Sequence, residues 1–455
     1  MENLLPSEFI DQLKKLPFFD LSPYLSSFNQ EITSFRINPK KISNRDINFE
    51  KITWSEFSYY LESRPEFILD PLWHAGVYYV QEAGSIFLEE VFKQLKLHEK
   101  DILALDLAAA PGGKSTHILS LLSQNSLLIS NEILPKRAKI LEENITRWGY
   151  DNQIITNNSS EDFRDFQGEF DLLVLDAPCS GEGMFRKDQN SISEWSLTNV
   201  QMCAERQKDI LENIKNILSY DGYLIYSTCT FNQEENEFLI EEFAKNNNFE
   251  LVDIDITKYA NLVKNNFTIR AIPGKSNTEG FTITVLQNKN DNPKKNNKSN
   301  HKLNKIKNPF PSLFSVDSEF DFIEYKEEVY LFRKAFENIL SKYLNKLKIV
   351  SFGNKIANSK KSQRSQIFIP NHNISSAINI NRKNIINLSD SDCLRFLKGE
   401  SLQLEIDKNN YYFVAYKNYS IGIVKITNGR ANNLYPDNFR IKKTVDYNEP
   451  IKSFL

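Results

Sequence analysis

Short apolar segments alternate with helical segments between residues 101 and 287, and this alternation constrains the fold more than any other feature of the chain. We expect strands at 102–106, 127–131, 153–156, 170–176, 223–227 and 281–286, and helices from 115 and at 135–148, 199–218 and 233–246. Strands that alternate with helices usually lie parallel and are joined by right-handed crossovers. The sequence therefore predicts an α/β fold with a doubly wound, mostly parallel sheet.

The rest of the chain divides into smaller regions, because 455 residues exceed one core and indicate roughly two to four domains. We expect a small α+β domain at 1–95, the α/β domain at 96–288, a linker at 289–309 and a C-terminal region at 310–455. Within the first domain we expect two short helices at 5–30 and strands at 34–39 and 74–82. Residues 289 to 307 hold seven lysines and one acid, which is typical of a solvated linker. Residues 402–442 are rich in Tyr, Phe, Val and Ile and predict a small β-rich module.

Composition excludes several classes of protein. No run of 18 apolar residues is present, so a membrane span is not expected. Residues 1–19 lack the basic and apolar regions of a secretory signal, and four cysteines in so long a chain indicate a reducing compartment. We therefore expect a cytoplasmic protein. We also expect it to be a monomer. The net charge of −3 means that any binding of nucleic acid must come from local patches.

The segment DLAAAPGGKS, residues 106–115, has the form of a cofactor loop. A predicted strand ends at Asp106, and small residues lead through Gly112 and Gly113 into a helix, so a ligand can approach the backbone and the helix N–H groups. The Gly-Lys-Ser ending resembles a phosphate-binding loop, but that motif requires glycine at the position of Ala108. An adenosyl cofactor fits better, because Glu132 follows the second strand and can accept both ribose hydroxyls.

Two cysteines follow the ends of two predicted strands. Cys179 comes after a proline in the loop that begins at Asp176, and Cys229 directly follows the strand at 223–227 and its Thr neighbour. A lone buried cysteine is usually inert, but two in matching strand-end loops indicate covalent chemistry by a thiolate. Cys203 and Cys393 are interpreted as structural. A metal site is not expected, because no C-x-x-C motif exists and the five histidines are scattered.

An adenosyl cofactor, an acid and two cysteines suit the methylation of a pyrimidine at C5. That carbon is a poor nucleophile until a thiolate adds at C6 and makes C5 an enamine carbon. A base then removes the C5 proton and the thiolate leaves. An acid beside the ring can bind N3 and the exocyclic amine of cytosine, which selects cytosine and stabilises the adduct. A base within a helix would first have to be extruded.

The sequence contains the four segments DLAAAPGGKS, NEILPKR, DAPCSGEGMFRK and YSTCTFNQEENE. They resemble the motifs of a known family, the RsmB/NOP (Nop/Sun) RNA cytosine-C5 methyltransferases. SFRINP and HAGVYYVQEAGS resemble the N-terminal region of that family, and GIVKITNGRANNLYPDNFR resembles the tail module of its bacterial RsmF-like 16S rRNA branch. The resemblance covers residues 30–287 well and 400–442 more loosely.

The resemblance implies a class I methyltransferase fold, which is a Rossmann-like core with a final antiparallel strand, S-adenosyl-L-methionine as cofactor, and a PUA-like C-terminal module. It implies that Cys229 is the nucleophile, that Cys179 assists release of the product, and that Asp176 faces the cytosine beside the cofactor. The implied cofactor contacts are Ala108, Ala109, Ala110, Pro111, Gly112, Gly113, Lys114, Glu132, Ser159 and Asp176.

The chain departs from the family pattern at several positions. Ala108 stands where the family usually has a cysteine that is not catalytic. Ser159 stands where an acid often faces the adenine amino group, a contact that Asp162 or Glu161 can replace. A histidine expected before the strand at 281–286 is missing.

The expected partner is ribosomal RNA or the small ribosomal subunit. Phosphates require Lys and Arg, and unstacked bases require aromatic platforms. The candidate RNA contacts are Arg36, Lys40, Lys41, Tyr78, Tyr79, Arg186, Lys187, Tyr435 and Arg440, with the lysine-rich linker as a further candidate. The alternatives are a transfer RNA methyltransferase of the same family and a non-catalytic RNA-binding factor of ribosome assembly on the same fold.

Overall fold

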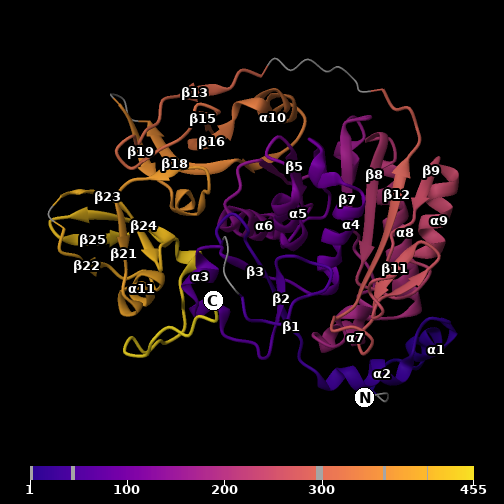
Figure 1. The fold of residues 1–455 in the computed structure, drawn as a ribbon. Coiled ribbons are helices and arrows are strands. Elements are labelled where there is room, and N and C mark those ends of the chain that lie inside the picture. Colours follow the sequence, from indigo (N-terminus) through magenta and orange to yellow (C-terminus); the bar gives the residue numbers. More distant parts are fainter. Residues whose placement is uncertain (1–3, 43–46, 294–300, 362–364, 407) are drawn as a thin grey trace.

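The computed structural model describes residues 4–42, 47–293, 301–361, 365–406 and 408–455. A large central sheet carries helices on both faces, and the C-terminal region from residue 301, orange to yellow in Figure 1, packs against one side of it. Among the described residues, no helix combines the length and the apolar character that crossing a membrane requires.

The central sheet has ten strands in the order β10-β11-β12-β8-β7-β4-β5-β6-β17, with β9 paired to β12. Five of them run parallel: β4 (Leu103–Asp106), β5 (Leu127–Asn131), β6 (Gln153–Thr156), β7 (Phe170–Asp176) and β8 (Leu218–Thr228). The order reverses between β4 and β7, which is the point where doubly wound sheets bind their ligands. The predicted last strand, β12 (Phe281–Asn288), pairs antiparallel with β8, as the resemblance implied.

The parallel strands are apolar on both faces because helices cover both sides of the sheet. Leu172 and Val174 of β7 pack into the cluster that includes residues of three helices, α4 (Leu88–Gln94), α5 (Gly113–Leu121) and α6 (Pro135–Trp148). Leu173 and Leu175 point to the opposite cluster, which includes residues of α8 (Leu197–Ile214) and α9 (Glu237–Asn246). Helix α8 ends four residues earlier than predicted, because the chain enters β8 at Leu218, opposite Phe170.

The remaining strands of the central sheet lie at its two edges. Three of them, β9 (Phe249–Val252), β10 (Val263–Asn265) and β11 (Thr268–Ala271), extend the β12 side and were not predicted. At the other edge β17 (Ile349–Phe352) pairs antiparallel with β6. A strand from beyond residue 309 therefore completes the central sheet. This sheet thus extends beyond the α/β domain that was predicted at residues 96–288.

The N-terminal region forms the two predicted helices, α1 (Ser7–Lys15) and α2 (Leu21–Ser26), and a three-stranded antiparallel sheet. Its strands are β1 (Thr33–Ile37), β2 (Ser58–Leu61) and β3 (Tyr78–Val80). The strand predicted at 74–82 is shorter than expected, because His74 ends a helical turn, α3 (Pro71–His74). Asp70 caps that turn by accepting a hydrogen bond from the backbone N of Leu72 at 2.9 Å.

Two five-stranded sheets make up most of the C-terminal region. The first contains β13 (Asn304–Ile306), β15 (Phe320–Tyr325), β16 (Glu328–Arg333), β18 (Asn354–Lys361) and β19 (Gln366–Pro370) and is accompanied by α10 (Glu337–Leu344). The second contains β21 (Ile385–Asn387), β22 (Leu402–Gln403), β23 (Asn410–Tyr416), β24 (Tyr419–Thr427) and β25 (Arg430–Asn433), with α11 (Asp390–Leu397). Between them β14 (Phe314–Ser315) pairs with β20 (Asn381–Arg382). Residues 294–300 of the predicted linker lie outside the described residues, and its last part forms β13.

Candidate active site

Cys179 and Cys229 meet at the carboxyl edge of the central sheet. Strands β7 and β8 are parallel neighbours, and Asp176 at the end of β7 is in register with Ser227 of β8, so the loops that follow lie side by side. The two sulfur atoms are 3.1 Å apart, and the backbone N of Cys229 donates to Sγ of Cys179 at 3.4 Å. The hydrogen bond to Cys229 and burial together raise the pKa of Cys179 well above its ordinary value. Cys179 is therefore held as the protonated partner of Cys229.

An ion pair lies beside the two cysteines. Nζ of Lys114 is 2.8 Å from Oδ2 of Asp176, and Oγ of Ser227 donates to Oδ1 of Asp176 at 2.8 Å. Burial lowers the pKa of Lys114, but its neighbours Asp176, Asp106 and Cys229 together raise it by more, so the pKa of this lysine lies above its ordinary value. Lys114 therefore carries a positive charge beside the two cysteine loops.

These groups share one cavity with the predicted cofactor loop. The cavity has a volume of about 370 Å³, and Cys229, Asp176 and Lys114 line it. Seven of the predicted cofactor contacts contribute to its wall: Ala108, Ala109, Ala110, Pro111, Gly113, Lys114 and Asp176. The fold thus places the loop after β4 next to the loops after β7 and β8, as the switch point of the sheet requires.

Gly112 is the predicted cofactor contact at the N-cap of α5. It has φ +113°, and a Cβ there would lie 3.3 Å from Leu141, so glycine suits this position.

Two other residues of the cofactor region are buried acids. Glu132 follows β5, and its Oε1 accepts from the backbone N of Leu134 at 3.0 Å. Its Oε2 pairs with Nη1 of Arg137 at 3.6 Å but accepts no hydrogen bond within the described part of the chain. Burial raises the pKa of Asp106 to about 7, and Oδ1 of this acid also lacks a hydrogen-bond partner among the described residues. Buried carboxylate oxygens without donors suit a ligand that brings hydroxyl groups.

The structure places Ser159 apart from this wall. Ser159 is the N-cap of a short 3₁₀ helix, Ser160–Phe163. Its backbone N and Oγ both donate to Oδ2 of Asp162, at 2.8 and 3.1 Å, and Nδ2 of Asn158 donates to the same oxygen. Ser159 and Asp162 thus form a capping box with each other, and neither lines the cavity.

A buried hydrogen-bond network holds the two cysteine loops together, and sequence reasoning missed it. Nδ2 of Asn232 donates to Oε1 of Glu182 at 3.0 Å and to Oε1 of Glu235 at 2.8 Å. Glu182 belongs to the Cys179 loop, and its Oε2 accepts from the backbone N of Phe231 and of Asn232 beyond Cys229. Glu235 in turn accepts from the backbone N of Ser180 at 3.0 Å. The signal was present as the acids within SGEGMF and FNQEEN, which flank the two cysteines.

Several candidate RNA contacts prove to be packing residues. Arg36 is buried, its Nη2 donates to Oγ1 of Thr116 at 2.7 Å, and its guanidinium lies 4.5 Å from the ring of Trp148. Tyr78 is buried and donates to Asp70 at 2.9 Å. Nζ of Lys41 donates to two backbone carbonyls, at 2.7 and 2.9 Å. These three side chains join the N-terminal sheet to its neighbours and are not free for RNA.

The C-terminal candidates and Arg186 are likewise occupied. Tyr435 is buried, and its hydroxyl lies 2.6 Å from Nδ1 of His74. Arg440 forms an ion pair with Asp437 at 2.7 Å. The side chain of Arg186 is buried against Glu279. By contrast Lys40 and Lys187 are exposed, and Tyr79 lines the cavity that holds the cysteines.

Three family models match separate parts of this chain. The model of 16S rRNA methyltransferase RsmB/F matches residues 92–287. The model of the N-terminal domain of 16S rRNA methyltransferase RsmF matches residues 5–83, and that of the methyltransferase RsmF PUA domain matches residues 383–441. The chain is similar to the RsmB/F methyltransferases in all three of these regions. The family resemblance, the Rossmann-like methyltransferase core and the PUA-like module predicted from the sequence are confirmed, and the protein is a methyltransferase.

Two relatives match this chain over more than nine tenths of their own length. The ribosomal RNA small subunit methyltransferase F of Shewanella piezotolerans is 27% identical over 448 residues, which cover 91% of this chain and 92% of the relative. That of Vibrio atlanticus is 28% identical and covers 95% of this chain and 97% of the relative. A solved methyltransferase homologue from Pyrococcus horikoshii is 26% identical with a TM-score of 0.53, covering 63% of this chain and 97% of that one. NSun6 from the same organism, solved with SFG, shares the fold at 19% identity with a TM-score of 0.52, over 63% of this chain and 99% of its own.

Proposed function

We propose that this protein transfers a methyl group from S-adenosyl-L-methionine to C5 of a cytosine in 16S ribosomal RNA, through a covalent bond between Cys229 and C6. The observation that carries the proposal is the pair of sulfur atoms 3.1 Å apart, beside the Lys114–Asp176 ion pair and in the same cavity as the cofactor loop. The similarity to this family supports the reaction class, and the whole-length relatives, which are methyltransferases of the small ribosomal subunit RNA, support the substrate.

The residues present fit the cofactor. The small side chains from Ala108 to Gly113 leave the backbone open to a ligand, and Glu132 keeps a carboxylate oxygen without a hydrogen-bond donor for the ribose hydroxyls. Ser159 is not part of this set, because it caps its own helix. When bound, S-adenosyl-L-methionine supplies a methyl group on a positively charged sulfur.

The chain's own residues act on the cytosine. The thiolate of Cys229 forms a bond to C6, and the electron pair of the C5–C6 double bond becomes available at C5, which takes the methyl group. Asp176 accepts a hydrogen bond from the exocyclic amine, which selects cytosine, while the ion pair with Lys114 holds Asp176 in place. Water takes the C5 proton, and the electron pair of the broken C5–H bond restores the C5–C6 double bond. The C6–S bond breaks, and its electron pair returns to Cys229. Cys179, held as a protonated thiol against Cys229, assists that departure.

Bisulfite sequencing of ribosomal and transfer RNA from cells with and without the gene tests the proposal. Methylated cytosine resists bisulfite, so a cytosine in 16S RNA should lose its protection when the gene is deleted. Complementation with a Cys229→Ala gene should fail to restore it. Loss of protection in transfer RNA alone would keep the chemistry and move the substrate. Unchanged protection in every RNA would favour a non-catalytic factor of ribosome assembly.

A further inference from the structure

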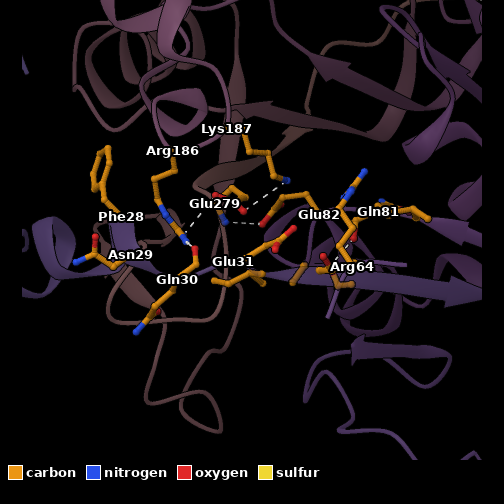
Figure 2. A pocket seen from close by; sticks show the side chains of 15 residues that line it. Phe28, Asn29, Gln30, Glu31, Arg64, Gln81, Glu82, Arg186, Lys187 and Glu279 are labelled. Carbon is orange, nitrogen blue, oxygen red and sulfur yellow. Dashed lines mark hydrogen bonds and ion pairs between the residues drawn. The ribbon is translucent and has the colours of Figure 1, made fainter. Parts of the chain in front are cut away.

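A second cavity opens beside the one that holds the cysteines. Its volume is about 740 Å³, and its walls come from the N-terminal region and from the rim of the active site. The two cavities share five residues: Val80, Gln81, Glu82, Lys187 and Glu279. Figure 2 shows side chains from both sources facing one another across this space. The second cavity therefore adjoins the active site.

The wall between the two cavities is rigid. Oε1 of Glu82 accepts from the backbone N of Glu279 at 3.0 Å, and Glu82 also accepts from the backbone N of Gly84 and of Ser85. The buried guanidinium of Arg186 lies 3.3 Å from Glu279 and donates to the backbone O of Gln30 at 2.6 Å, an arrangement visible in Figure 2. Strand β3 and the start of β12 are thus tied to the loop after α2, and the cavity is preformed.

Two cations at this cavity are exposed, unlike Arg186. The side chain of Lys187 is 41% exposed, and its Nζ lies 3.6 Å from Oε1 of Glu279. Nη1 of Arg186 pairs with the other oxygen of that carboxylate, Oε2, at 3.3 Å. Arg64 is exposed, and its guanidinium rests 5.4 Å from the ring of Phe67; among the described residues it makes no ion pair. Both side chains can therefore turn to a phosphate without leaving a buried acid unpaired.

Other polar groups of the wall also lack protein partners. Oγ1 of Thr33 and Nε of Arg186 are buried and have no hydrogen-bond partner within the part of the chain that the structure describes. Asn29 and Glu31 are exposed at the same cavity. Buried polar atoms are normally satisfied, so these sites suit a polar ligand that brings donors and acceptors of its own.

We propose that this cavity receives the nucleotide adjacent to the target cytosine, with Lys187 and Arg64 binding its phosphates. The inference rests on the proposed function and adds the path of the RNA to it. A cytosine that enters the active site stays covalently joined to its neighbours, so an adjacent nucleotide must lie at the mouth. The shared wall makes the second cavity that mouth, and its polar side chains suit base edges and the 2′-hydroxyl.

The test compares binding of 16S RNA from cells that lack the gene, and methyl transfer to it, over a series of salt concentrations. Lys187→Ala and Arg64→Ala are each expected to weaken binding and raise KM for the RNA by roughly three- to tenfold. Each should also lower the salt slope by about 0.7, the value for one phosphate contact of a single strand. Lys187→Arg, which keeps the charge, should restore both. Lys245→Ala, an exposed lysine in the last turn of α9 that lines neither cavity, is the matched control.

The outcomes separate this inference from the proposed function. If the double variant K187A/R64A binds the RNA with wild-type affinity and salt slope, the cavity is not the site of the adjacent nucleotide. If the wild type binds the RNA but transfers no methyl group, the proposed reaction fails, while the salt slopes still decide on the cavity. A wild type that does not bind this RNA overturns both.

Discussion

Cys179 and Cys229 occupy one cavity, but the hydrogen bond between them gives them different roles. Cys229→Ala removes the atom that bonds to C6, so we expect methyl transfer to fall by at least about a thousandfold. Cys179→Ala leaves that atom in place and removes the protonated thiol that assists the departure of the Cys229 sulfur. We expect this variant to accumulate protein joined covalently to RNA, seen as a band of reduced mobility in a denaturing gel.

The double variant C179A/C229A serves as the control for this trap, because it should give no such band. Binding of S-adenosyl-L-methionine, measured by calorimetry, should be close to that of the wild type in all three variants. A Cys179→Ala protein that turns over normally, with no trapped RNA, would remove Cys179 from the release step.

Asn232 connects the carboxylates of Glu182 and Glu235 and so fixes the distance between the two cysteine loops. Asn232→Ala leaves both buried acids short of a donor, which should lower the free energy of unfolding by about 1–3 kcal/mol. We also expect kcat to fall more than KM for the cofactor rises, since the cofactor loop after β4 is not part of the network. Urea unfolding and steady-state kinetics measure the two effects.

An exposed asparagine provides the comparison. Nδ2 of Asn125 donates to Asp101 at 3.1 Å on the surface, so Asn125→Ala should leave stability within about 0.5 kcal/mol and kcat unchanged. Equal losses in the two variants would mean that the network has no special part in placing the cysteines.

At the scale of elements, β17 ties the C-terminal region to the catalytic sheet. Phe352 is fully buried and stacks on Tyr330 with ring centroids 4.3 Å apart, inside the same apolar cluster as β7. We expect Phe352→Ala to lower the free energy of unfolding by roughly 3–5 kcal/mol. A protein ending at residue 309 would lack this strand and leave β6 as an open edge.

Urea unfolding followed by circular dichroism measures the effect of Phe352→Ala. Ile367→Ala on β19 is the control: Ile367 is 53% exposed, so little change is expected. If Phe352→Ala and Ile367→Ala unfold at the same urea concentration, β17 does not contribute to the stability of the core.

The elements that the sequence predicted well are those with a local signal. Alternating strands and helices place β4 to β8, and small residues after a strand mark the cofactor loop. Strand β17 has only four residues, and its partner β6 is about 190 positions away, so nothing local distinguishes it from a loop. Arg36 and Tyr435 were assigned to RNA for a similar reason: their residue types suit RNA, and only the tertiary contacts show that they are buried.

At the scale of the whole molecule, the two ends of the chain share one apolar cluster. Phe35 of β1 and Phe454 have ring centroids 5.0 Å apart, and the C-terminal segment lies beside the N-terminal strands in Figure 1. Two histidines and a tyrosine meet at this junction. The ring centroids of Tyr435 and His372 are 4.8 Å apart, and the hydroxyl of Tyr435 forms a hydrogen bond with His74. The N-terminal region and the PUA-like module therefore share one packed junction.

This junction should make the protein sensitive to acid. Burial, with the charge of Arg147, lowers the pKa of His74 and that of His372 from 6.5 to about 3. Both rings are therefore neutral in the folded protein, whereas the unfolded chain takes up their protons below about pH 6.5. Their contribution to stability is present above that pH and is lost as the pH falls toward 3. His372→Phe removes one titrating ring, so its stability should fall less steeply on acidification, by up to about 1.4 kcal/mol per pH unit.

Urea unfolding at intervals between about pH 7.5 and 4.5 gives the slope of stability against pH directly. His98→Gln is the matched control, because the side chain of His98 is 44% exposed and lies away from the junction. The wild type and His98→Gln should lose stability in parallel as the pH falls, and His372→Phe should diverge from both. Three parallel curves would mean that protonation of His372 does not limit the junction, and that another buried group causes the loss in acid.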